Sequence, residues 1–231
     1  MSNSQLAQFD GEIIDGLRFC ALTYELFDKI RGAENGPSRL QMRASQVEKK
    51  LLEELLPICK YIQAKYRAGK YISVRWASGS QQFDAQVIQT GAYVQEGYFP
   101  ASAYLEVTCV MHPNEYLGRE LLDTVGGAFG LDGIHRLKSG EIESKPVVYK
   151  NHEFIDSYSK LVIKQIGKKA GINYPLDTSL IVQCNLDRLY TPEEWEVLVA
   201  EVRNAQPEHQ FREIFMYDTV SEYSCSLWGK S

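Results

Sequence analysis

The sequence lacks the features of a membrane protein and of a secreted one. No apolar run approaches the length of about 20 residues that spans a bilayer. The first residues, Met1 to Gln5, carry no basic and apolar segments of the kind that form a signal peptide. We therefore expect no membrane partner and a cytoplasmic location.

Disulfide and zinc motifs are also missing. The five cysteines are odd in number, widely scattered and without a C-x-x-C pair. The four histidines show no H-E-x-x-H or comparable spacing. These patterns indicate reduced, buried thiols and argue against a zinc site.

Basic residues are fewer than acidic ones, with 25 Lys and Arg against 30 Asp and Glu, which gives a net charge of -5. Such a charge gives no overall attraction for nucleic acid or for an anionic membrane, so either contact needs a local basic patch. The 231 residues suffice for a sizeable core in one domain, and no internal repeat is visible.

The spacing of apolar residues alternates along the chain between the period of a helix and that of a strand, which predicts alternating helices and strands. Ser45 and Glu48 form a capping-box signature for a long helix, which Pro57 should kink or break. We expect helices near residues 9–30, 45–69, 113–129, 153–171 and from 191, a loop or irregular hairpin over 132–150, and strands near 71–76, 83–88, 104–110, 179–184, 212–217 and 223–228. A three-strand meander followed by a helix and a buried strand predicts a mixed α/β fold, with a central mixed sheet flanked by helices.

Two strands of the predicted meander each carry one carboxylate among apolar and β-branched residues. Asp84 lies on the second strand and Glu106 on the third, where Glu106 and Thr108 project to the same face. If these strands pair, the two carboxylates converge and could hold Mg²⁺ or Mn²⁺. The simpler interpretation of Asp84 is a salt bridge to Arg75 across the hairpin.

This order of elements, with an acid on each of two neighbouring strands, resembles the core of the PD-(D/E)xK nuclease superfamily, the restriction-endonuclease-like fold. The resemblance covers roughly residues 45–185. Asp84 matches the first acidic position, with Phe83 in place of the motif proline, and Glu106 matches the second. The resemblance implies a metal site made by these two carboxylates.

The resemblance also implies a division of the chain. We expect a single domain over residues 1–231, made of an N-terminal helical extension (1–44), a nuclease-like core (45–185) and a C-terminal helix and strands (186–231). Homodimers are common in the superfamily, but no heptad or large apolar stripe supports a homodimer here.

The motif lysine, two residues after the second acid, is Thr108 in this chain. A hydroxyl is neutral and supplies no positive charge at phosphorus. Arg119, about two helical turns after the strand, is the first candidate for the replacing charge. Basic residues of the following loop come next and are the candidates for nucleic-acid contacts: Arg136, Lys138, Lys145 and Lys150.

Three other features have a functional and a structural interpretation. Glu53 could add a metal ligand from the first long helix, or could be a solvated residue paired near Lys49 or Lys50. His112 could meet a scissile phosphate, or could stabilise a His-Pro turn. A last set forms either a phosphate-binding patch or a solvated helix face: Lys164, Lys168 and Lys169, together with Arg136 and Lys138.

The resemblance implies a Mg²⁺-dependent phosphodiester hydrolase acting on DNA or RNA, with Thr108 orienting the attacking water and Arg119 or a loop lysine supplying the missing charge. The alternative is a catalytically degenerate module of the same fold that binds nucleic acid or a protein partner, which the replaced lysine and the negative net charge favour. A third interpretation is an unrelated α/β protein, indicated if Asp84 and Glu106 point to opposite faces of the sheet.

Overall fold

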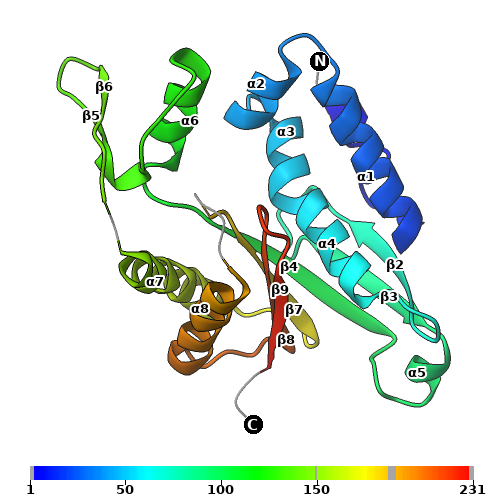
Figure 1. Cartoon of the computed structure of the whole chain (residues 1–231). Helices are drawn as coiled ribbons and strands as arrows, with labels where there is room; N and C mark the ends of the chain where they lie inside the picture. Colours follow the sequence, from blue (N-terminus) through cyan, green and yellow to red (C-terminus); the bar gives the residue numbers. More distant parts are fainter. Residues whose placement is uncertain (1–2, 149, 187–190, 229–231) are drawn as a thin grey trace.

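The computed structural model of the chain describes residues 3–148, 150–186 and 191–228. Its centre is a seven-stranded sheet in the order β1-β2-β3-β4-β7-β8-β9 (Figure 1). Neighbours from β1 to β4 pair antiparallel, β4, β7 and β8 run parallel, and β9 returns antiparallel. The strands are β1 (Ile13–Asp15), β2 (Tyr71–Trp76), β3 (Ala85–Thr90), β4 (Ser102–Val110), β7 (Thr178–Cys184), β8 (Glu213–Asp218) and β9 (Ser224–Trp228).

Helices cover both faces of this sheet, so the predicted fold class is confirmed (Figure 1). One core cluster joins α1 (Gly16–Arg31) and α4 (Leu56–Lys65) to side chains such as Leu105 and Val107 of β4. The other joins α7 (Asn151–Ala170) and α8 (Pro192–Ala205) to Val110 of β4 and Leu180 of β7. β7 is buried along its whole length, as its apolar run predicts.

The predicted helix over residues 45–69 forms without a break in the chain, as α3 (Gln46–Lys50), a π-helical segment η2 (Leu51–Leu55) and α4. Ser45 begins it, since its Oγ accepts a hydrogen bond from Val47 N at 3.2 Å. Pro57 lies in the first turn of α4. In a regular α-helix the ring of Pro57 would clash with the carbonyl group of Glu53, four residues earlier. Here Glu53 lies in the wider π-helical turn of η2. The expected kink or break is therefore a local widening of the helix.

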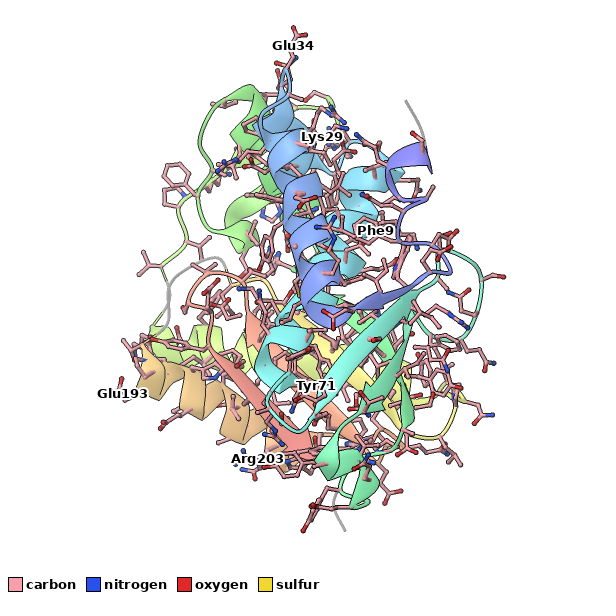
Figure 2. The ribbon with its side chains drawn as sticks, turned by 90° about the vertical axis from the view of Figure 1, so that its right-hand side faces the viewer. Phe9, Lys29, Glu34, Tyr71, Glu193 and Arg203 are labelled. Atoms are coloured by element: carbon pink, nitrogen blue, oxygen red, sulfur yellow. The ribbon has the colours of Figure 1, made fainter. Side chains whose placement is uncertain are left out.

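The N-terminal helix begins later than its apolar period suggests. Residues 13–15 form the edge strand β1, which pairs with β2. α1 begins after Asp15, whose Oδ1 accepts a hydrogen bond from Leu17 N at 3.0 Å. Figure 2 looks onto the face that α1 covers, with Glu34 at the tip of the loop after this helix. α2 (Gly36–Met42) follows that loop.

A segment with one helix and one hairpin connects β4 to α7. It contains α6 (Glu115–Thr124), the 3-10 turn η3 (Leu131–Gly133), and a hairpin of β5 (Ile134–Arg136) and β6 (Ile142–Ser144). Leu117, Leu121 and Ile134 form its own small apolar cluster. The expected loop or irregular hairpin over residues 132–150 is thus a hairpin that packs on α6 (Figure 1).

Three short helical elements complete the fold over the described ranges: η1 (Asn3–Gln5), α2 and α5 (Ala92–Gln95). Within those ranges, no helix combines the length and the apolar character needed to cross a bilayer.

Candidate active site

Asp84 and Glu106 lie close together beside β4. β3 and β4 pair antiparallel as expected, with Ala85 opposite Leu105, and Asp84 lies in the bend just before β3. Leu105 points into the core under α1 and α4, so Glu106 points to the other face of the sheet, toward α7. The charges of Glu106 and Lys169 both act on the carboxyl group of Asp84, which brings these three groups into one neighbourhood.

The backbone of β4 holds Asp84 in place. Asp84 N donates to Leu105 O at 2.9 Å, and Asp84 Oδ2 accepts from Val107 N at 2.7 Å. No ion pair joins Asp84 to Arg75 among the residues described, and Arg75 instead lies opposite Gln86. The simpler interpretation, a salt bridge across the hairpin, does not hold.

The pKa of Asp84 is raised to about 7, mainly by burial and also by the charges of Glu106 and Glu54. The hydrogen bond from Val107 N and the charge of Lys169 act in the opposite direction. Asp84 is therefore a carboxyl group for which ionisation is costly in the folded protein unless positive charge is nearby.

Lys169 supplies a positive charge at this point. Its Nζ forms an ion pair with Glu106 Oε1, with the two side chains 27% and 10% exposed. Lys169 lies in the last turn of α7, which packs against β4. Val162 and Ile166 face the sheet from the same helix, and Lys169 follows them at helical spacing on the same side.

Tyr174, in the loop after α7, completes the surroundings of Glu106. Its ring packs against Phe211 with centroids 5.3 Å apart. Burial raises the pKa of Tyr174, and the nearby charge of Glu106 raises it further, so the phenol remains protonated. Sequence reasoning did not find Tyr174.

Thr108 lies on the same face as Glu106, two residues further along β4, and is buried. A buried threonine on a central strand also satisfies the preference of β-branched residues for pleated sheet. Its expected role in orienting water stays a prediction.

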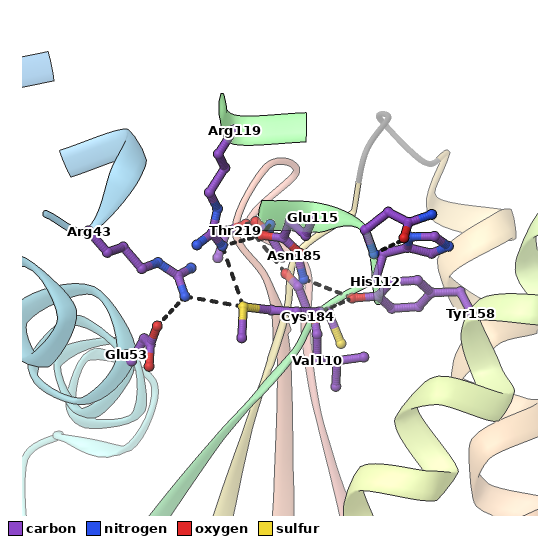
Figure 3. A network of polar contacts seen from close by, with 12 residues as sticks. Arg43, Glu53, Val110, His112, Glu115, Arg119, Tyr158, Cys184, Asn185 and Thr219 are labelled. Carbon is purple, nitrogen blue, oxygen red and sulfur yellow. Dashed lines mark hydrogen bonds and ion pairs between the residues drawn. The ribbon is translucent and has the colours of Figure 1, made fainter. Parts of the chain in front are cut away.

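Arg119 lies elsewhere, so it does not replace the motif lysine. Its guanidinium pairs with Glu115 and contacts Met111 Sδ at 3.4 Å, beyond the carboxyl end of β4. Met111 is five residues from Glu106, or about 16 Å at roughly 3.3 Å per residue of extended chain. α6 begins just after the strand, and Arg119 extends from it toward Glu115 (Figure 3).

The basic residues of the following loop are also remote from the carboxylates. Arg136 pairs with Glu120 at 2.6 Å on the far side of the hairpin, and Lys145 pairs with Glu143 at 2.9 Å. Lys138 is exposed in the hairpin turn. Lys150 precedes α7, at the opposite end from Lys169, about 28 Å away at roughly 1.5 Å per helical residue. A role for these four residues in nucleic-acid binding stays a prediction.

Two further residues take structural roles in this arrangement. Glu53 pairs with Arg43, and not with the neighbouring lysines of its own helix. His112 accepts from Asn114 N at Nδ1 (3.1 Å) and meets Asp132 Oδ1 at Nε2 (2.8 Å), which stabilises the turn after β4.

The donor set at Asp84 and Glu106 fits a hard divalent cation with most of its ligands from outside the protein. In the part of the chain that the structure describes, no group of three or more His, Cys, Asp or Glu side chains could hold a metal ion. Mg²⁺ is commonly bound by one or two carboxylates, with water and substrate phosphate filling the other positions. The raised pKa of Asp84 marks a place where added positive charge is favourable.

No protein-family model matches this chain, and neither the search of curated proteins nor that of solved structures returned a match. The function of the chain is therefore inferred from the geometry and chemistry of its residues.

Proposed function

We propose that the protein is a Mg²⁺-dependent phosphodiester hydrolase of the restriction-endonuclease-like fold, acting on DNA or RNA. Asp84 and Glu106 would hold the metal, and Lys169 would supply the positive charge that Thr108 cannot. The observation that carries the proposal is the closeness of two carboxylates and one ammonium beside β4.

The order of strands supports the same proposal. β2, β3 and β4 form an antiparallel meander, and α7 leads from β4 to the parallel strand β7. This is the order in which the resemblance places its two acids, on the second and third strands of the meander. Glu106 lies on β4, the third strand, and Asp84 comes directly before β3, the second strand.

Lys169 reaches the carboxylates from a helix and not from the strand. An ammonium within contact of Glu106 is close enough to donate to a phosphate oxygen or to a water molecule beside this carboxylate. Fixed positive charge at such a position stabilises the charge that develops on phosphorus during hydrolysis. Tyr174 lies close enough to Glu106 for the charge of this carboxylate to raise the pKa of the phenol.

A bound Mg²⁺ supplies two things at such a site, a lowered pKa for its water and neutralisation of charge on the phosphate. Because the pKa of Asp84 lies at about 7, this group is partly protonated at neutral pH, and protons compete with the metal for it. We therefore expect activity to rise between about pH 6 and pH 8 as Asp84 ionises.

Cleavage of single-stranded DNA, double-stranded DNA and RNA in Mg²⁺ or Mn²⁺ tests the proposal. We expect the wild type to cleave at least one substrate, and Asp84→Asn, Glu106→Gln and Lys169→Met each to lower the rate by about 100-fold. Lys168→Met is the matched control, because it removes an exposed lysine next to Lys169 and should leave the rate unchanged. Equal, low activity in the wild type and in Asp84→Asn would reject the proposal.

The second candidate is a catalytically degenerate module of the same fold that binds nucleic acid or a protein partner. The ion pair between Lys169 and Glu106 favours it, since it already neutralises one of the two carboxylates. The net charge of -5 favours it as well. The two candidates differ in whether the protein holds a divalent cation at Asp84.

The proposal includes nucleic acid as the partner and the cytoplasm as the location. The five cysteines, all described and all free, support a reducing compartment. A homodimer would follow from the resemblance alone, and sedimentation of the protein with and without a DNA duplex would test it.

A further inference from the structure

A cavity of about 490 Å³ lies beyond the carboxyl ends of β7 and β8, away from Asp84 and Glu106. We call it the arginine cavity. One wall is apolar and comes from α1, α2 and the η2–α4 helix: Tyr24, Phe27, Leu40, Leu52 and Leu56. The opposite end is polar and includes Arg43, Arg119, Gln183 and Asn185.

Arg43 and Arg119 converge on a single sulfur atom at this polar end. Arg43 Nη1 lies 3.2 Å from Met111 Sδ, and Arg119 Nη2 lies 3.4 Å from the same atom. Figure 3 shows the two arginines approaching from different sides, one from the chain after α2 and one from α6. A thioether is a weak acceptor, so neither guanidinium has a strong partner at this point.

The two guanidiniums are mostly buried, at 11% and 17% side-chain exposure. Each has one carboxylate partner, Glu53 for Arg43 and Glu115 for Arg119, and neither carboxylate lines the arginine cavity. A guanidinium has five N–H donors, so each keeps donors for another acceptor. Lys60 and Glu222 also line the cavity and pair with each other at 2.6 Å. Arg43 and Arg119 are therefore the charged lining residues whose ion-pair partners lie outside the lining.

Neighbouring amides are oriented at the same end of the cavity. Tyr217 donates its hydroxyl proton to Gln183 Oε1 at 2.6 Å, so the Gln183 amide nitrogen points away from the Tyr217 hydroxyl. Asn185 is fixed by Thr219 Oγ1, which donates to its Oδ1 at 3.2 Å, and by Glu115, which accepts from its Nδ2. These contacts hold the polar end in one arrangement before any ligand enters.

We propose that the arginine cavity binds a small amphipathic anion, with an aromatic or aliphatic body and one carboxylate or phosphate group. The body would lie against the apolar wall, and the anionic oxygens would accept hydrogen bonds from Arg43 and Arg119. In the described structure, the only acceptor that these two arginines share is the Met111 sulfur. Cavities of 300–1,000 Å³ with mostly apolar walls and a few convergent polar groups are typical of small-molecule sites. This proposal does not depend on the proposed nuclease activity.

Calorimetric titration of the full chain with decanoate and with 1-naphthyl phosphate tests the proposal, with decanol and 1-naphthol as the uncharged counterparts. We expect saturable 1:1 binding of at least one anion and binding of its uncharged counterpart at least ten times weaker. Arg119→Met should weaken the anion at least tenfold, and Leu52→Trp, which fills the apolar side, should weaken it to a similar degree. Arg203→Met, an exposed arginine on α8 far from the cavity, is the control and should bind as the wild type does (Figure 2).

Arg119→Met leaves Glu115 buried without its cation and could unfold this region. The double variant Arg119→Met/Glu115→Gln removes both charges and so leaves no buried carboxylate without its cation. Circular dichroism shows whether this variant folds, and its affinity for the anion then reports the loss of the ligand contact alone. The proposal is overturned if neither anion binds the wild type, or if a folded double variant binds as tightly as the wild type. It is also overturned if Arg203→Met loses binding to the same degree.

Discussion

Replacing Asp84 with asparagine removes a carboxylate that the fold holds where ionisation is unfavourable. Its pKa rises from 3.8 to about 7 on folding, mainly through burial and then through Glu106 and Glu54. At roughly 1.4 kcal/mol per pKa unit, the ionised group costs on the order of 4 kcal/mol in the folded state relative to the unfolded chain. Asparagine carries no charge and keeps an oxygen that can accept from Val107 N.

The sign of the pH dependence follows from the same shift. Between about pH 4 and pH 7 the folded protein binds more protons at Asp84 than the unfolded chain does, so the free energy of unfolding falls as the pH rises. Below pH 4 both states are protonated and the penalty disappears. We therefore expect Asp84→Asn to stabilise the protein by about 2–4 kcal/mol at pH 8 and by nearly nothing at pH 4.

Urea unfolding of the wild type and Asp84→Asn at pH 4, 6 and 8, in EDTA, measures this difference. Asp156→Asn is the control, because Asp156 is an exposed residue paired with Lys160 at 2.7 Å and should show a small, nearly constant effect. If Asp84→Asn is no more stable than the wild type at pH 8, or if its effect does not change with pH, the reasoning about this site is refuted. A group kept at a cost to stability is typical of a functional site.

Two smaller predictions concern the neighbours of Asp84, and a third concerns the N-terminus of α8. Glu54→Gln removes a charge that raises the pKa of Asp84, so NMR titration should show that pKa fall; an unchanged value would contradict the placement of Glu54. Lys169→Met breaks a largely buried ion pair and should destabilise the protein by about 2 kcal/mol at pH 7, against nearly no change for Lys168→Met in the same urea assay. Thr191→Ala removes the N-cap of α8, where Thr191 Oγ1 accepts from Glu194 N at 3.2 Å, and should cost about 1 kcal/mol by thermal unfolding.

Local periodicity was enough to predict β4, which carries Glu106, and to predict β3, although β3 begins one residue after Asp84. Alternation along 104–110 predicts that Glu106 faces away from Leu105, and the structure has this arrangement because Leu105 lies in the core under α1 and α4. The same reasoning missed β1, since three residues are too few to reveal a period of two inside a longer apolar window.

The replacing lysine could not be found from the sequence near Glu106. Lys169 is 63 positions further along the chain and reaches Glu106 only because α7 crosses back over β4. One local signal was available, since Lys169 extends the apolar stripe of Val162 and Ile166 toward the sheet. Arg119 seemed the nearer choice by sequence distance, but α6 begins beyond the strand end and turns it toward Glu115.

Calorimetric titration of the wild type and of Asp84→Asn with Mn²⁺ at pH 6 and pH 8 tests the joint cation site most directly. The two carboxylates together predict one saturable Mn²⁺ in the wild type, bound more tightly at pH 8 than at pH 6, and lost in Asp84→Asn. A wild type with no saturable site, or with one that survives in Asp84→Asn, would contradict the account.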